Sequence, residues 1–138
     1  MKTARLILLL LVCSAVSLAQ ANKQSFGYEV LKNPVGKLIL SLKVEVPDKG
    51  LFLGVSIYPP GVVNTLEEGK HFSFPVKQGL YVQELEIDGK FENGTFEAAL
   101  WTGKTPKEKC AADDATCQKL GFRHTGMTAY LWGPLRTK

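Results

Sequence analysis

Two histidines are the residues in this 138-residue chain best suited to acid–base or metal chemistry. They are His71 and His124, and neither has a second histidine at a metal-binding spacing such as H-x-H or H-x-x-x-H. A metal site needs three or four converging ligands, so the sequence predicts neither a metal nor a cofactor. We therefore interpret both histidines as surface or half-buried residues.

The chain also lacks the usual signals of an activated nucleophile. It has no G-x-S-x-G elbow, and residues 22–138 contain no free cysteine beside a base. Glu84 and Glu86 share one face of a predicted strand with apolar residues, which indicates a strand at a sheet edge rather than a catalytic pair. The sequence therefore predicts no catalytic residue and favours a protein that is not an enzyme.

Cys110 and Cys117 have a C-x6-C spacing, which fits neither a redox C-x-x-C pair nor a zinc knuckle. One continuous helix over residues 106–120 would separate them by about 10.5 Å along its axis. A disulfide needs Cα atoms within about 7 Å, and Asp113-Asp114 favours a break, because aspartate prefers caps and turns. We predict a disulfide that clips a helical connection at about 105–120 and contributes about 2.5 kcal/mol.

Both ends of this helical connection have sequence signals. Thr105-Pro106-Lys107-Glu108 is a capping-box sequence with proline at the first helical position. Gly121 is the residue type that commonly ends a helix. We expect the helical segment to begin after Thr105 and to stop at Gly121.

Residues 1–21 have the order of parts found in a secretory signal peptide. Lys2 and Arg5 precede an apolar run from Leu6 to Val12, and Ala19-Gln20-Ala21 is a small-x-small cleavage site. The run is too short to span a membrane, which takes roughly 20 apolar residues. We predict that this leader is removed and that the protein is secreted or periplasmic, where disulfides persist.

One feature of the leader suggests an alternative. Cys13 follows Leu10-Leu11-Val12, which loosely resembles the lipobox of bacterial lipoproteins. That pattern expects a small residue just before the cysteine, and Val12 is bulky. Export without a lipid is therefore favoured over lipidation at Cys13.

Residues 22–138 have the length of one domain. The full chain has a formal net charge of +4, and its basic residues are scattered along the sequence, whereas a nucleic-acid surface requires a clustered basic face. No second apolar segment approaches the length of a membrane span. We expect a protein or glycan partner, no nucleic acid and no stable membrane span.

Alternation of apolar and polar residues dominates the mature chain. Every second residue from Leu38 to Val46 is leucine or valine; a helix would scatter these side chains, whereas a strand places them on one face. Further strands are expected over residues 26–31, 51–58, 72–76, 80–87, 95–102 and 122–132. The predicted core comprises Leu38, Leu40, Leu42, Val44, Leu53, Val55, Ile57, Phe72, Phe74 and Leu100.

Six or seven short strands with closely spaced turns predict an all-β fold, an antiparallel β-sandwich with one short helical connection. Their number and spacing resemble those of immunoglobulin-like and fibronectin type III-like domains. A small barrel is the structural alternative.

Three aromatic residues alternate away from the more apolar strand faces, namely Trp101, Tyr130 and Trp132. They are candidates for a binding platform, although tryptophan also fills the second side of partly covered strands. A long loop from residue 59 to 70 is a second candidate for recognition, through Pro60, Val62 and Val63. It also fits a plain crossover between the sheets.

Asn93-Gly94-Thr95 is an N-glycosylation acceptor sequence. Asn-Gly is also the preferred pair for a type I′ hairpin turn, as is Asp-Gly at Asp88-Gly89. We favour the hairpin interpretation and keep Asn93 as a candidate glycosylation site.

The sequence thus favours a secreted or periplasmic, non-catalytic binding or interaction module. A secreted enzyme inhibitor and a carbohydrate-binding module are the alternatives. An inhibitor would present a rigid loop over residues 59–70, and a sugar module would expose Trp101 or Trp132 on one flat face. An enzyme would bring His71 and His124 together in a cleft with carboxylates.

Overall fold

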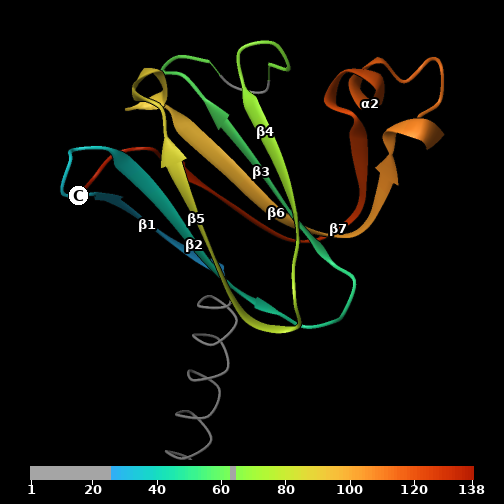
Figure 1. The fold of residues 1–138 in the computed structure, drawn as a ribbon, viewed down its shortest axis with the longest axis horizontal. Coiled ribbons are helices and arrows are strands. Elements are labelled where there is room, and N and C mark those ends of the chain that lie inside the picture. The colour runs from blue at the N-terminus through green and yellow to red at the C-terminus, as the bar shows by residue number, and fades with distance from the viewer. Residues whose placement is uncertain (1–25, 63–64) are drawn as a thin grey trace, which may run out of the picture.

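The computed structural model describes residues 26–62 and 65–138 (Figure 1). The predicted signal peptide and the alternative lipidation site at Cys13 lie outside the described residues, as does Val63. Within the described part of the chain, no helix is long and apolar enough to cross a membrane.

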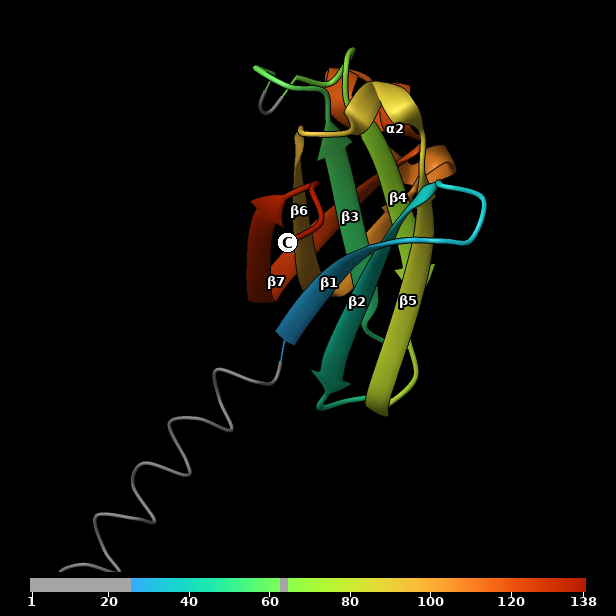
Figure 2. The same cartoon turned by 90° about the vertical axis from the view of Figure 1, so that its left-hand side faces the viewer.

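Two antiparallel sheets face each other, which confirms the predicted β-sandwich (Figures 1 and 2). One sheet has the strand order β1-β2-β5 and the other has the order β4-β3-β6-β7. Because the two sheets are separate, the barrel alternative is wrong. The strands of the described residues are β1 (Phe26–Lys32), β2 (Leu38–Val46), β3 (Phe52–Tyr58), β4 (Lys70–Pro75), β5 (Gly79–Ile87), β6 (Thr95–Pro106) and β7 (Phe122–Pro134).

The alternating pattern of β2 positions the core. Its leucine and valine side chains are all buried, and the residues between them are half-buried or exposed. The strand is hydrogen-bonded to β1 on one side and β5 on the other, so its apolar face packs between the sheets. The core also contains inward-facing residues of the other sheet, including Leu53, Val55, Ile57, Phe96, Ala98 and Leu100.

The edge strands β4 and β5 are less buried than the central strands β2 and β3. Phe72 and Phe74 stack on each other with ring centroids 6.1 Å apart, and both are only half-buried. The prediction that they are fully buried is wrong, because β4 has a neighbour on one side only. The edge position predicted for Glu84 and Glu86 is confirmed, because β5 forms the border of its sheet and both residues are exposed.

The ends of β6 and β7 extend away from the rest of the sheet and carry the helical connection (Figure 1). β6 continues to Pro106, a single 3₁₀ turn covers Lys107–Lys109, and the helix α2 covers Ala115–Leu120. Pro106 occupies the cap of the 3₁₀ turn and no side chain caps it, so the capping-box prediction at Thr105 is wrong. The extended strand pairing leaves Thr105 inside the β6–β7 ladder.

Cys110 and Cys117 form the predicted disulfide across a break in the helical connection. Their Cα atoms are 5.7 Å apart, because the chain turns between the 3₁₀ segment and α2. Asp114 caps α2 by accepting a hydrogen bond from the Cys117 amide at 3.0 Å. Gly121 ends the helix with a φ of 84°, as expected for a left-handed C-terminal residue.

Asn93-Gly94 does not form the expected two-residue hairpin. It follows a 3₁₀ turn at Gly89–Phe91 and leads into β6, and the positive φ of 65° belongs to Asn93. The Asn93 amide donates to the Leu135 carbonyl at 2.9 Å, and the Leu135 amide donates to the Gly94 carbonyl at 2.9 Å. The pair thus ties the entry of β6 to the C-terminal segment, and the Asn93 residue remains exposed.

Candidate functional site

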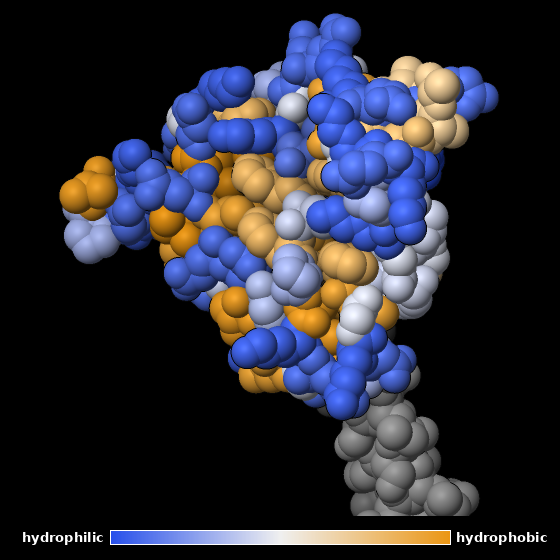
Figure 3. Space-filling model, turned by 45° about the vertical axis from the view of Figure 1, so that its right-hand side comes forward, coloured by the Kyte–Doolittle hydropathy of each residue, from blue (hydrophilic) through white to orange (hydrophobic). Residues whose placement is uncertain are grey.

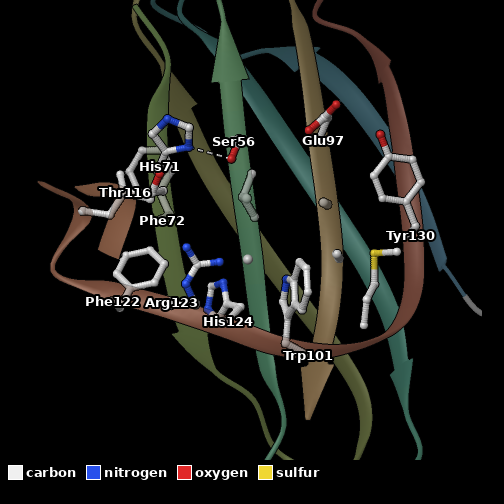
Figure 4. Close-up of a pocket in the computed structure, with 16 residues that line it drawn as sticks. Ser56, His71, Phe72, Glu97, Trp101, Thr116, Phe122, Arg123, His124 and Tyr130 are labelled. Atoms are coloured by element: carbon white, nitrogen blue, oxygen red, sulfur yellow. Dashed lines mark hydrogen bonds between the residues drawn. The ribbon is translucent and has the colours of Figure 1, made fainter. Parts of the chain in front are cut away.

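A hollow of about 330 Å³ lies on the outer face of the four-stranded sheet (Figure 4). Its floor contains two small residues, Gly54 of β3 and Ala99 of β6, which are cross-strand partners. Larger side chains from β3, β4, β6, β7 and α2 line the rest of the hollow. They include Ser56, His71, Glu97, Trp101, Thr116, Leu120, Phe122, Arg123, His124, Met127 and Tyr130.

The hollow exists because Gly54 has no side chain. A Cβ atom on this residue would lie 2.9 Å from both Cε1 of His124 and Nε1 of Trp101. The two rings therefore lie over the glycine backbone, stacked with centroids 5.4 Å apart and planes 12° apart. An alanine in this position would force at least one ring to move.

An irregularity in the β6–β7 pairing shapes one wall. The register shifts between Leu100 and Trp101, so that Trp101 pairs with Met127 and Thr128 is left out of the ladder. Such a bulge bends the strand and changes which side chains share a face. Regular alternation along β7 would put Met127 and Tyr130 on opposite faces of the sheet. Because of the bulge, both residues line the same hollow.

The disulfide-clipped connection completes the wall at the same end. Thr116 and Leu120 of α2 line the hollow together with Phe122 at the start of β7. The Arg123 guanidinium forms a short ion pair with the Asp114 carboxylate, and hydrogen bonding from Arg123 lowers the pKa of Asp114 to about 2. This ion pair ties α2 to β7.

His71 projects from β4 and is paired with a serine of the neighbouring strand. Its Nδ1 lies 2.7 Å from Oγ of Ser56, whereas its Nε2 is buried without a hydrogen-bond partner in the part of the chain that the structure describes. Burial lowers the pKa of His71, and the negative charge of Glu97 opposes this effect. The lowered pKa favours the neutral ring at pH 7, and no carboxylate of the described residues hydrogen-bonds to its second nitrogen.

His124 makes a similar contact from the opposite side of the hollow. Its Nε2 lies 2.8 Å from Oγ of Ser73, and its ring also packs against Phe122 at a centroid distance of 4.8 Å. Burial, and then the nearby Lys104 ammonium, lower the pKa of His124 to about 4. A histidine with this pKa is a weak base at neutral pH.

The two histidines thus line one hollow together with Glu97, an arrangement that the sequence analysis associated with an enzyme. Among residues 26–62 and 65–138, neither Ser–His pair has the third group that orients the base in an activated nucleophile. Among the residues that the structure describes, no cluster of three or more metal-ligating side chains occurs. The geometry provides a shaped, partly polar surface rather than a recognisable catalytic constellation.

The predicted binding residues divide into two groups. Trp101 and Tyr130 line the hollow. Trp132 lies on the same face of the sheet, where it is the cross-strand partner of Glu97. Tyr130 is 49% exposed and Trp132 is 62% exposed, whereas Trp101 is half-buried under His124. Pro60 and Val62, from the long loop, do not line the hollow.

Viewed from the side that carries β4 and α2, apolar residues gather across the middle of the molecule between hydrophilic borders (Figure 3).

Sequence reasoning missed Ser56, Glu97 and Phe122 as part of a site. Strand parity contained a signal for two of them, because Ser56 and Glu97 alternate with buried neighbours and are cross-strand partners.

Comparisons of the chain with protein-family models, with curated proteins and with solved structures find no match.

The low pKa of His124 leads to a testable pH dependence. The unfolded chain binds a proton on this histidine near pH 6.5, whereas the folded chain binds it only near pH 4. Between these pH values, unfolding is therefore accompanied by the uptake of a proton on His124. The contribution of the neutral His124 ring to the free energy of unfolding is complete above pH 6.5 and is lost as the pH falls toward 4. We expect the His124 ring signals in NMR spectra to titrate with a midpoint near pH 4, against about 6.5 in urea. A folded-state midpoint above pH 6 would contradict the burial described here.

Proposed function

We propose that this chain is an exported, non-catalytic binding module whose ligand occupies the hollow on the outer face of the four-stranded sheet. The observation that carries the proposal is the hollow itself, with a floor of Gly54 and Ala99 and with Trp101 and Tyr130 among its walls. Preformed concave sites with aromatic walls and a few polar groups are typical of small-ligand binding. Ser56 and Glu97 supply such polar groups.

Two further features support export. The leader over residues 1–21 has the parts of a signal peptide. The Cys110–Cys117 disulfide is of a kind that persists in oxidising compartments. The disulfide also clips the segment that supplies Thr116 and Leu120 to the hollow, so the exported environment would preserve the site.

Tryptophan fluorescence provides a direct test, because the chain has two tryptophans. A Trp132→Phe variant of residues 22–138 retains Trp101 as the single reporter in the hollow. We expect at least one member of a panel of glucose, cellobiose, N-acetylglucosamine, phenylalanine and choline to change its emission in a saturable way. In the same background, Gly54→Ala should weaken that binding about tenfold or more, since the new methyl group displaces Trp101 or His124.

Gly27→Ala is the matched control for this experiment. Gly27 lies in β1 of the other sheet, and a Cβ atom there meets nothing within 4 Å. This control should bind like the parent, and circular dichroism should show the same β-signature for both variants. Unchanged affinity in folded Gly54→Ala, or no response to any panel member, would contradict the proposed site.

A carbohydrate-binding module is the second candidate, and the exposure of Trp132 is the observation that favours it. At 62% exposure, its ring is accessible for stacking against a sugar, with the half-exposed Tyr130 on the same face. Sugar binding that is abolished by Trp132→Ala but retained by Gly54→Ala would favour this platform over the hollow. The inhibitor alternative depends on loop 59–70, whose described residues Pro60 and Val62 do not line the hollow.

A further inference from the structure

Glu97 is an unpaired acidic group at one end of the hollow. It occupies an outward-facing position on the central strand β6, with Ser56 of β3 on one side and Trp132 of β7 on the other. The residue is half-buried, and it takes part in none of the ion pairs formed among the described residues. A bound cation would supply the opposite charge that this carboxylate lacks among the described residues.

Aromatic residues flank Glu97 on the two neighbouring strands. Trp132 is its direct cross-strand partner, and Tyr130 and Tyr58 lie at the diagonal positions of the two neighbouring strands. Diagonal neighbours on a sheet are about 7–8 Å apart, within reach of aromatic side chains. Burial, and then the charge of Glu97, raise the pKa of Tyr130, which places the phenol within the field of the carboxylate. Glu97 also adds to the raised pKa of Tyr58, whose main cause is burial.

The positive charges of the hollow lie at its other end. The Lys104 ammonium lies over the rings of Phe52 and Phe122, at 5.6 and 5.0 Å from their centroids. Arg123 is paired with Asp114. Figure 4 shows Arg123 and Phe122 on one side of the hollow and Glu97 with Tyr130 on the opposite side. Neither cation forms an ion pair with Glu97.

We propose that the ligand carries an organic ammonium group, and that this group binds at the Glu97 end of the hollow; the inference rests on the proposed function. The carboxylate supplies the opposite charge, and the faces of the exposed Trp132 and Tyr130 supply cation–π attraction. Carboxylate plus aromatic walls is the chemistry that recognises primary amines and quaternary ammonium ions. A neutral sugar would use the rings and leave the carboxylate without a counter-ion.

Paired probes of equal shape test the charge requirement. Choline and its neutral isostere 3,3-dimethylbutan-1-ol are titrated into ¹⁵N-labelled residues 22–138, with cadaverine as a primary amine. We expect choline or cadaverine to shift the amide signals of Ser56, Glu97, Tyr130 and Trp132 in a saturable way, and the isostere to bind at least about tenfold more weakly. Glu97→Gln should weaken binding of the cation about tenfold.

Glu84→Gln is the matched control, because Glu84 is an exposed carboxylate on β5 of the other sheet, and it should leave the affinity unchanged. Equal binding of choline and its isostere, or equal affinity in Glu97→Gln, overturns the inference. So does the absence of binding by both cations up to about 50 mM, beyond the range of specific sites. If a neutral sugar then binds in the hollow, the ammonium inference alone has failed. If no probe perturbs the hollow, the proposed function has failed with it.

Discussion

Replacing Leu42 with alanine is expected to lower the free energy of unfolding by about 2–5 kcal/mol, the usual cost of removing a fully buried leucine side chain. Leu42 is 0% exposed and lies on β2, between β1 and β5. The surrounding residues belong to both sheets, so the cavity has little freedom to collapse. Urea unfolding of residues 22–138, followed by circular dichroism, gives the free energy directly.

Lys43→Ala is the control for this measurement. It changes the next residue of the same strand, whose side chain is exposed on the outer face, so the expected change is within about 0.5 kcal/mol. A loss below about 0.5 kcal/mol for Leu42→Ala would mean that the core lies on the opposite face of β2.

The sandwich was predictable because its central strands alternate strictly. In β2 every second residue is a buried leucine or valine and, Ile39 apart, the residues between them are polar and partly or fully exposed; a one-residue slip would expose the whole buried set. The disulfide was predictable for a different reason. Helix geometry excluded an unbroken helix between Cys110 and Cys117, and the structure has Asp114 capping a new helix at that break.

The wrong predictions concern segments in which tertiary contacts outweigh local signals. Thr105 has the sequence of a helix cap, yet it pairs with Arg123 in the β6–β7 ladder. Asn93-Gly94 has the sequence of a hairpin turn, yet hydrogen bonds to Leu135 determine its conformation. Both partners are distant in sequence, and no local pattern identifies them. Local propensity is a weak guide when long-range pairing satisfies the same backbone groups.

The candidate site was the least predictable part of the molecule. His71 and His124 are far apart in the chain, yet both line the same hollow. Gly54 allows the His124 ring to lie close to the backbone of β3, and the start of β7 brings His124 to the hollow. A bulge beside Trp101 changes the parity of β7, which no alternation pattern indicates in advance. Strand alternation made Trp101 and Tyr130 candidate binding residues, and both line the hollow; their binding role stays a prediction.

Replacing Gly94 with alanine is the second change with a large expected effect, a loss of about 3 kcal/mol, because there is no space for a methyl group. A Cβ atom on Gly94 would overlap the carbonyl oxygen of Tyr58 and lie 2.9 Å from the carbonyl oxygen of Phe91. Both obstacles are backbone atoms, so a side-chain rotation cannot relieve the clash. The Gly94 carbonyl also accepts the Leu135 amide at 2.9 Å, and displacement of Gly94 weakens this link.

Thermal unfolding of residues 22–138 measures this effect, and the expected fall in Tm is about 10–15 °C. Gly89→Ala is the matched control. Gly89 belongs to the same connection between β5 and β6, a Cβ atom there meets nothing within 4 Å, and its φ is not positive. This control should unfold within a few degrees of the parent, or slightly above it, since alanine restricts the unfolded chain. Equal unfolding temperatures for the two variants would show that the Gly94 backbone is free to move, and the close packing of Gly94 against Tyr58 would then be wrong.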